Sequence, residues 1–170
     1  MMVNDYTYVP LLDGLGSLTI YKDGTLSIDR YSSKKLSPKP VTSIRQNGPL
    51  ILYKGDVTTD AVSGGYQVWG RTTTNSMYTW RSGVGLTKNG NLIYAVGPSL
   101  TAATLASALR AGGAVNAIQL DINSFWVRFS TFTPLGNATY SSESILNTLT
   151  NGGKSYLSGY NKDFFYLTAN

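Results

Sequence analysis

An acidic residue at the end of an apolar strand is the first feature of this sequence that could do chemistry. Residues 117–120 read as a buried strand, and Asp121, Asn123 and Ser124 follow it directly. A carboxylate and an amide at a strand end suggest a site, although Asp and Asn also bond their own backbone readily in turns. Arg81 is the nearest candidate counter-charge, with a solvent-facing or packing arginine as the alternative. The local pattern leaves both roles open.

The stretch from Trp80 to Phe132 supplies the elements that must position these residues. Lys88-Asn89-Gly90 lies between two apolar runs and predicts a tight hairpin, because Asn-Gly adopts positive φ angles at low steric cost. Thr101 is predicted to cap a helix that Gly112-Gly113 ends. The stretch therefore predicts strand, turn, strand, helix, strand, polar turn and strand, in that order.

The rest of the chain reads as further strands, loops and one more helix. Lys22-Asp23-Gly24 predicts a second hairpin, for the same reason as the first. The other expected segments are an extended edge segment at 6–12, an irregular stretch at 56–78, a polar loop at 133–142, a short helix at 145–149 and a terminal strand at 164–167. The predicted fold class is α+β, a β-rich mixed sheet with hairpins and one or two packing helices.

Cysteine and histidine are both absent from the 170 residues. Their absence excludes disulfides, thiol nucleophiles, the usual zinc sites and catalysis by Ser-His or Cys-His pairs. Any chemistry must therefore use carboxylates, arginine, lysine, tyrosine or hydroxyl groups. We expect no cofactor and assign no metal ligand, and whether a metal ion joins the acids and amides near Asp121 stays open. With 42% hydrophobic residues, 12 Tyr and 18 Gly, the chain is predicted to form one β-rich globular domain.

The charge balance argues against two kinds of partner. The chain has 14 basic and 9 acidic residues, but the basic ones cluster only loosely, at Arg30, Lys34, Lys35 and Lys39. A nucleic-acid surface needs a denser basic face with interleaved aromatic residues, so no nucleic-acid partner is expected. No apolar run is long enough to span a membrane, and residues 1–5 do not resemble a secretory signal. The abundance of Thr, Ser, Asn, Gly and Tyr nevertheless favours an extracellular or cell-surface protein.

Four stretches, in order along nearly the whole chain, match the pattern of a known family. They read LDGLGSLTIYKDGTLSIDRY, SIRQNGPLI, TWRSGVGLTKNGNLIYAVGPSLTAATLASALRAGGAVNAIQLDINSFWVRFSTF and NKDFFYL. Together they resemble the phosphodiester glycosidase domain, whose family includes the lysosomal uncovering N-acetylglucosaminidase and many bacterial proteins of exopolysaccharide type. In this resemblance, Asn47-Gly48-Pro49 corresponds to an NG-P-like segment. Arg81 corresponds to the arginine before a small-x-Gly strand, and Asp121 to the aspartate of the strand-end motif.

The resemblance implies a hydrolase-like domain that acts on a glycosyl phosphodiester of a cell-surface or extracellular polysaccharide. Its catalytic residues would be Asp121, as the acid or nucleophile near the anomeric carbon, and Arg81, as the cation that holds the phosphate. The implied substrate-binding residues are Asn123, Asn47, Ser124 and Trp80.

Two departures from the family pattern bear on this activity. Better-studied members follow the aspartate with glycines and a serine, whereas this chain continues with Ile-Asn-Ser-Phe at residues 122–125. A full family domain also begins with a further segment carrying an Asn-Gly-Gly-Phe-like loop, which nothing before Tyr6 supplies. The domain over residues 1–170 is therefore expected to be truncated at its N-terminal side. A glycosidase ordinarily uses two carboxyl groups, and Asp163 is the least implausible partner for Asp121.

Two other functions stay open beside the enzyme. The chain could be a non-catalytic surface module that binds glycan or a protein partner, with Tyr and Trp side chains as flat stacking faces for sugars. It could also be a structural subunit that assembles with copies of itself through edge strands, because a missing front segment would leave a sheet edge open. The expected partners are a carbohydrate or sugar phosphodiester, and a homo-oligomer or a second chain that completes the pocket.

Overall fold

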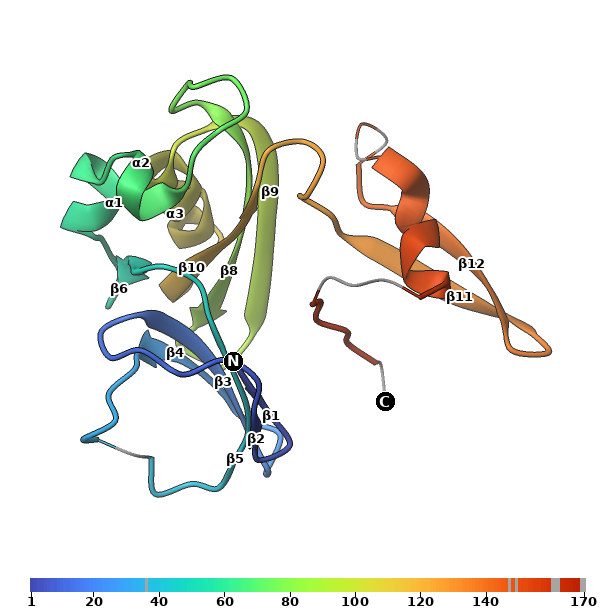
Figure 1. Cartoon of the computed structure of the whole chain (residues 1–170), viewed down its shortest axis with the longest axis horizontal. Helices are drawn as coiled ribbons and strands as arrows, with labels where there is room; N and C mark the ends of the chain where they lie inside the picture. Colours follow the sequence, from blue (N-terminus) through green and yellow to red (C-terminus); the bar gives the residue numbers. More distant parts are fainter. Residues whose placement is uncertain (36, 147, 149, 160–162, 169–170) are drawn as a thin grey trace. The chain divides into compact units, whose positions relative to one another are not determined.

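The computed structural model describes residues 1–35, 37–146, 148, 150–159 and 163–168. The chain divides into two compact units, Met1–Val127 and Arg128–Asn170 (Figure 1). In the described residues, the first unit carries two five-stranded sheets and three helices, and the second carries a two-stranded sheet and a 3-10 helix. The single domain expected over residues 1–170 stays a prediction beside this division.

The N-terminal sheet has the strand order β2-β1-β5-β3-β4. Its strands are β1 (Met2–Val3), β2 (Tyr6–Thr7), β3 (Gly16–Tyr21), β4 (Leu26–Arg30) and β5 (Val41–Gln46). The hairpin predicted at residues 22–24 is confirmed, since β3 and β4 pair antiparallel across it. Hydrogen bonds from the hydroxyl and backbone N–H of Thr25, together with Lys39, hold the pKa of Asp23 well below its usual range and fasten this turn.

The central sheet has the strand order β7-β6-β10-β8-β9. Its strands are β6 (Leu50–Tyr53), β7 (Asp56–Val57), β8 (Thr79–Thr87), β9 (Leu92–Leu100) and β10 (Ala114–Ile122). The hairpin predicted at residues 88–90 is confirmed as the β8–β9 connection. All strand pairs among the described residues are antiparallel, so the β-rich character is confirmed but the predicted mixed sheet is wrong. The reason is that β8 lies between β9 and β10, so the two parallel strands that a helix connects never pair.

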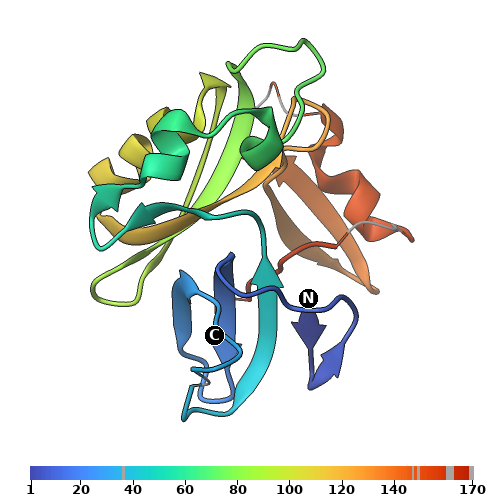
Figure 2. The same cartoon turned by 60° about the vertical axis from the view of Figure 1, so that its left-hand side comes forward.

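Three helices lie on one side of the central sheet, as Figures 1 and 2 show. They are α1 (Thr59–Ser63), α2 (Tyr66–Trp69) and α3 (Ala102–Ala111). The predicted start and end of the last helix are confirmed, because Thr101 and Thr104 cap each other's backbone N–H groups and Gly112 follows its last residue. The stretch at 56–78, expected to be irregular, contains α1, α2 and β7.

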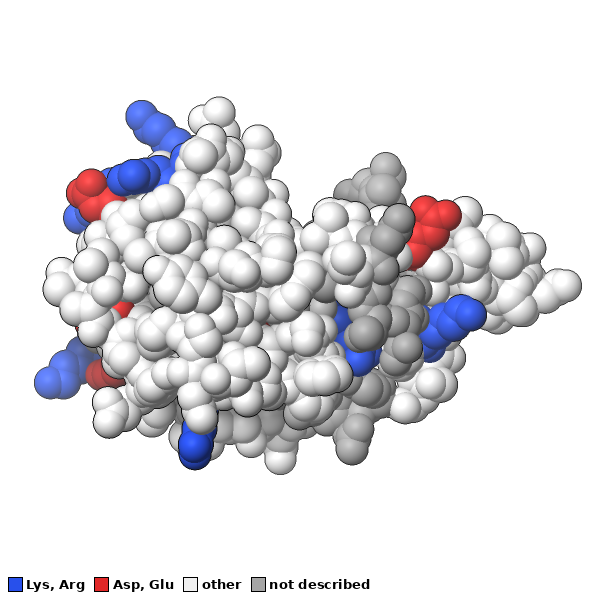
Figure 3. Space-filling view, turned by 90° about the horizontal axis from the view of Figure 1, so that it is seen from above, with Lys and Arg blue, Asp and Glu red and all other residues white. Residues whose placement is uncertain are grey.

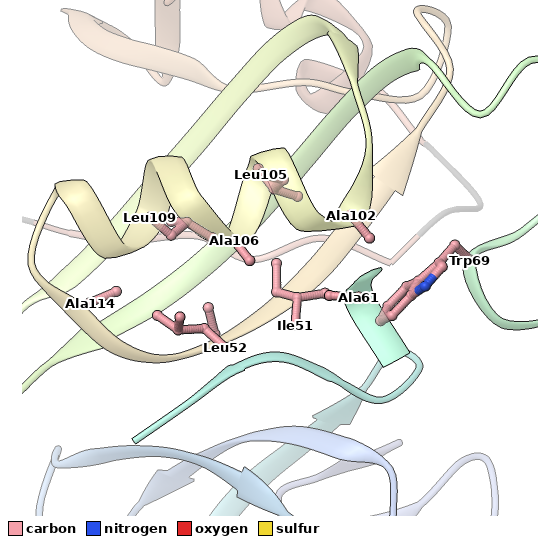
Figure 4. Close-up of a cluster of buried hydrophobic side chains, with 10 residues drawn as sticks. Ile51, Leu52, Ala61, Trp69, Ala102, Leu105, Ala106, Leu109 and Ala114 are labelled. Atoms are coloured by element: carbon pink, nitrogen blue, oxygen red, sulfur yellow. The ribbon is translucent and has the colours of Figure 1, made fainter. Parts of the chain in front are cut away.

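Two apolar cores cover opposite faces of the central sheet. On the helix side, Leu105 and Leu109 of α3 are fully buried over Ile51 and Leu52 of β6 (Figure 4). On the other side, the two sheets enclose a second core, made of Leu18, Ile28, Leu50, Val84 and Ile118. Neighbouring residues of β10 serve different cores because successive side chains of a strand point to opposite faces.

Two glycines of β8 allow close packing in the first unit, Gly83 against α3 and Gly85 against the neighbouring strand β10. A Cβ added at Gly83 would lie 3.0 Å from a methyl carbon of Leu105 and 3.1 Å from one of Leu109. A Cβ added at Gly85 would lie 2.6 Å from the Cβ of Ala114. The missing side chains therefore make room for the leucines of the helix and for the neighbouring strand.

The second unit differs from its predicted form. The polar loop expected at 133–142 is instead a hairpin of β11 (Ser130–Gly136) and β12 (Thr139–Ser144). Its turn places Asn137 and Ala138 at φ 51° and 56°. These strands show no alternation of apolar and polar residues, because nearly all residues of both strands are exposed on both faces.

Among the described residues of the second unit, the predicted helix at 145–149 and the predicted strand at 164–167 are both wrong. Ile145 and Leu146 are not helical, residues 147 and 149 lie outside the described residues, and the helical segment there is the 3-10 helix η1 (Thr150–Leu157). The strand predicted at residues 164–167 is absent from the described segment 163–168, whose residues are all exposed. Apolar sequence alone does not make a strand without a partner for its backbone groups.

We expect Gly85→Ala to destabilise the first unit by about 1–3 kcal/mol, because the new methyl group overpacks the space beside Ala114. Urea unfolding of the purified chain measures the change. The matched control is Gly65→Ser, since a Cβ there meets nothing within 4 Å and serine is favoured at the start of a helix. Equal stability of both variants would show that the close approach is not tight.

Candidate functional site

The guanidinium of Arg81 lies fully buried at the centre of the predicted site. Its Nε donates to the carbonyl of Leu100 at 2.9 Å, its Nη1 to Oε1 of Gln119 at 2.5 Å, and its Nη2 to the carbonyl of Met77 at 3.1 Å. Burial lowers the pKa of Arg81, yet a guanidinium stays protonated in proteins. The cation therefore joins the end of β9, strand β10 and the segment that enters β8.

This geometry gives Arg81 a positioning role. Its side chain has no exposed surface, so a substrate phosphate has no access to it in this arrangement. The direct hold on phosphate that the resemblance implies stays a prediction. What the structure shows is the alternative considered for this residue, a packing arginine, with all three acceptors supplied by the first unit.

Asp121 lies exposed at a break in the strand pairing. The register of β10 against β8 shifts between Gln119 and Ile122, so Asp121 falls within an irregularity of the ladder. The hydroxyl of Ser82 accepts from the backbone N–H of Asp121 at 3.2 Å and donates to its carbonyl at 3.3 Å. A bulge of this kind re-aims side chains beside active sites, and here the backbone of the acid is fixed on both sides.

Asn123 is a buried clamp on the segment before β8. Its Oδ1 accepts from the backbone N–H of Thr73 at 3.1 Å and from the hydroxyls of Thr73 and Thr79 at 3.4 and 3.3 Å. Its backbone adopts φ 69°, a left-handed conformation that asparagine tolerates, and its carbonyl accepts from the N–H groups of Trp126 and Val127. Asn123 thus forms a turn with its backbone and anchors the Thr73 segment with its side chain. Its substrate-binding role stays a prediction.

Three further predicted substrate-binding residues occupy different environments. Asn47 donates from Nδ2 to the carbonyls of Gln119 and Leu120, both at 2.8 Å, so it fastens the β5–β6 junction to β10. Trp80 is half-buried, and its carbonyl accepts from the N–H of Asn123 at 2.8 Å. Ser124 is exposed. The structure thus brings Asn47, Trp80 and Asn123 to the same end of β10 as Asp121, with roles toward a substrate still untested.

Asp163, the predicted second acid, is exposed and belongs to the second unit. Its role as a partner of Asp121 stays a prediction.

Sequence reasoning missed Gln119, the residue that completes the buried network. It is buried, and it accepts from Arg81 while its Nε2 donates to the carbonyl of Trp69 at 3.5 Å. The available signal was an amide inside the apolar run from Ala117 to Leu120. A buried polar side chain needs partners, so such a residue marks a polar network.

The described residues offer no other conventional centre. Among them no group of three or more His, Cys, Asp or Glu is placed to hold a metal ion. None of the helices in these residues has the length and apolar character required to cross a membrane. The face seen in Figure 3 shows Lys and Arg side chains scattered among uncharged atoms rather than gathered into a patch.

A family model described as phosphodiester glycosidase matches residues 1–121, which is most of the first unit and ends at the exposed acid. The chain belongs to the phosphodiester glycosidase family. The match confirms the resemblance that the sequence motifs indicated, while the second unit lies outside the matched residues.

Two solved structures resemble this chain at low sequence identity. The zebrafish N-acetylglucosamine-1-phosphodiester alpha-N-acetylglucosaminidase catalytic domain, auto-inhibited by its pro-peptide, is 20% identical with a TM-score of 0.49. That match covers 79% of this chain and 43% of the zebrafish chain. A hypothetical protein from Synechocystis is 19% identical with a TM-score of 0.36, over 69% of this chain and 30% of that one. No curated protein matches the sequence.

We expect Asn123→Gly to destabilise the first unit by about 1–3 kcal/mol, because the donors of Thr73 and Thr79 lose their shared acceptor. Glycine keeps the positive φ, so only the amide is removed. Hydrogen exchange of the Thr73 amide, followed by mass spectrometry or NMR, should become faster. Asn137→Gly is the matched control, since Asn137 is exposed at φ 51°. An unchanged Thr73 amide would contradict the clamp.

Proposed function

We propose that this chain is a hydrolase domain that cleaves a glycosyl phosphodiester of a cell-surface or extracellular polysaccharide. Family membership supports the reaction class. The observation that carries the proposal is the exposed carboxylate of Asp121 on a backbone held by Ser82 and flanked by the buried Gln119 and Asn123. Catalysis requires a reactive group that is exposed to substrate and is held in a fixed geometry by the residues around it.

The cleavage of a sugar 1-phosphodiester suits a site with a single exposed carboxylate on a fixed backbone, which Asp121 provides. The Asp121 carboxylate acts in one of two ways: it takes a proton from the water that attacks the anomeric carbon, or it attacks that carbon itself. In the second case water then hydrolyses the glycosyl ester, which releases the sugar and frees the carboxylate. The bond between the anomeric carbon and the phosphate oxygen breaks, and a phosphomonoester leaves with the electron pair. The second pKa of a phosphomonoester is about 6, so it leaves as an anion with little need for a general acid.

Arg81 supports this reaction from below the surface. It holds Gln119, two residues before the acid, and the Leu100 carbonyl, so the end of β10 keeps its place against β9. Because the guanidinium is buried and hydrogen-bonded, its effect on substrate passes through the backbone it fixes.

A second candidate function is a non-catalytic module that binds glycan. Tyr6 and Tyr8 are exposed at the edge strand β2 and just after it, with ring centroids 4.8 Å apart in an edge-to-face arrangement. Exposed aromatic faces are suited to stacking on sugars. A surface location fits both candidates and rests on composition alone.

We expect Asp121→Asn to lower the rate of sugar release from synthetic sugar 1-phosphodiesters by about a hundredfold to ten-thousandfold, because the amide neither attacks nor accepts a proton. Reducing-sugar release at saturating substrate measures this. Asp29→Asn, an exposed acid on β4, is the control and should leave the rate unchanged. Wild-type protein without turnover at high concentration would contradict the hydrolase, and loss of glycan binding in Tyr8→Ala would then favour the second candidate.

A further inference from the structure

The proposed reaction acts on a negatively charged substrate, and a second arginine near Asp121 is better exposed to it than the buried Arg81. A phosphodiester carries a negative charge, and recognition of such a group by a guanidinium is strong when the donors reach it directly. Arg81 is buried and its three hydrogen bonds go to protein acceptors. An exposed cation beside Asp121 would reach a phosphate without breaking these bonds.

Two hydrogen bonds fasten the segment between α2 and β8, the loop at the top of Figure 1, along the end of β10. Gln119 donates to the carbonyl of Trp69 at 3.5 Å, and the N–H of Thr73 donates to Asn123 at 3.1 Å. The first bond joins residues that lie two before Arg71 and two before Asp121, and the second joins residues that lie two after each. The two segments of chain therefore run side by side, and Arg71 and Asp121 occupy corresponding positions between the two hydrogen bonds.

Between these two hydrogen bonds, side-chain packing also holds the segment before β8 close to the end of β10. A Cβ added at Gly70 would lie 3.0 Å from Cδ1 of Ile122, so the residue before Arg71 contacts the residue after Asp121. Gly70 also adopts φ 82°, a conformation that glycine permits without strain. The segment is further closed by the hydroxyl of Thr72, which donates to the carbonyl of Ser76 at 2.7 Å.

The side chain of Arg71 is available to a ligand. Arg71 is exposed, and among the described residues it makes one side-chain hydrogen bond, from Nε to Oδ1 of Asn75 at 3.4 Å, and no ion pair. That contact is long for a hydrogen bond, so its loss on binding a ligand costs little. An exposed arginine on a turn is commonly just solvated. Arg71 differs because hydrogen bonds on both sides of it hold its segment beside the end of β10.

We propose that Arg71 binds the phosphate of the sugar phosphodiester while Asp121 acts at the anomeric carbon. This assignment rests on the proposed function and adds its anion-binding residue. It divides the two arginines by environment: the buried Arg81 positions the strand end, and the exposed Arg71 contacts the charged part of the substrate.

The test compares Arg71→Gln, Arg71→Lys and the matched control Arg110→Gln. Arg110 is also an exposed arginine, but it lies in the last turn of α3, which leads into the opposite end of β10. We expect Arg71→Gln to raise KM for glucose 1-(methyl phosphate) or N-acetylglucosamine 1-(methyl phosphate) about tenfold to a hundredfold, the range for a lost charged hydrogen bond. Arg71→Lys should recover part of this loss, and Arg110→Gln should match wild type.

Binding of the same two probes, followed by 31P NMR, separates this inference from the hydrolase proposal. Turnover with equal KM in Arg71→Gln and Arg110→Gln would overturn the role of Arg71 and leave the hydrolase standing. Binding without turnover, weakened only by Arg71→Gln, would support Arg71 and overturn the hydrolase. Wild-type protein that neither binds nor cleaves the probes would overturn both. Thermal unfolding of each variant shows that the comparison is made on folded protein.

Discussion

The buried guanidinium of Arg81 is the constraint on which the site depends. Moving a charged group out of water is expensive unless its donors are paired, and removing a partner from a buried charge is strongly destabilising. Arg81 meets this requirement with acceptors from β9, β10 and the segment before β8. Those three parts are therefore held in one arrangement, and the strand end that carries Asp121 is fixed with them.

Close packing on both faces of the central sheet makes this arrangement possible. The leucines of α3 seal one face over the bare backbone of Gly83, and the N-terminal sheet seals the other. Water is thereby kept from the Arg81 network, which strengthens its hydrogen bonds. The polar residues at the C-terminal end of β10 therefore lie on a backbone that two sets of hydrogen bonds hold in place, those of Arg81 and those of Asn123.

Family membership and geometry contribute different parts of the functional argument. Family membership supports the proposed reaction class, because the matching family model is described as phosphodiester glycosidase. The fold alone would not establish an activity, since one fold serves many functions. The local geometry adds an exposed acid, a buried arginine whose donors are taken by protein acceptors, and an exposed arginine on a segment that is hydrogen-bonded to β10 and to Asn123.

The sequence by itself determined the elements with strong local chemistry. Both hairpins followed from Asp-Gly and Asn-Gly, and α3 followed from the capping Thr101 and the terminal Gly112. Asp121 at its strand end was also readable, together with the family motifs. By contrast, the β11–β12 hairpin lacks a buried face and so left no alternation to detect.

Only the tertiary structure decided which polar residues face each other. Whether Arg81 is buried or solvated depends on β9, β10 and the segment before β8, which supply its acceptors. The hydrogen bonds of Trp69 with Gln119 and of Thr73 with Asn123 join residues 50 apart in sequence. The order of the strands, which kept β9 and β10 from pairing, is equally non-local. Local propensity cannot encode these contacts, because their free energy arises only when distant segments exclude water together.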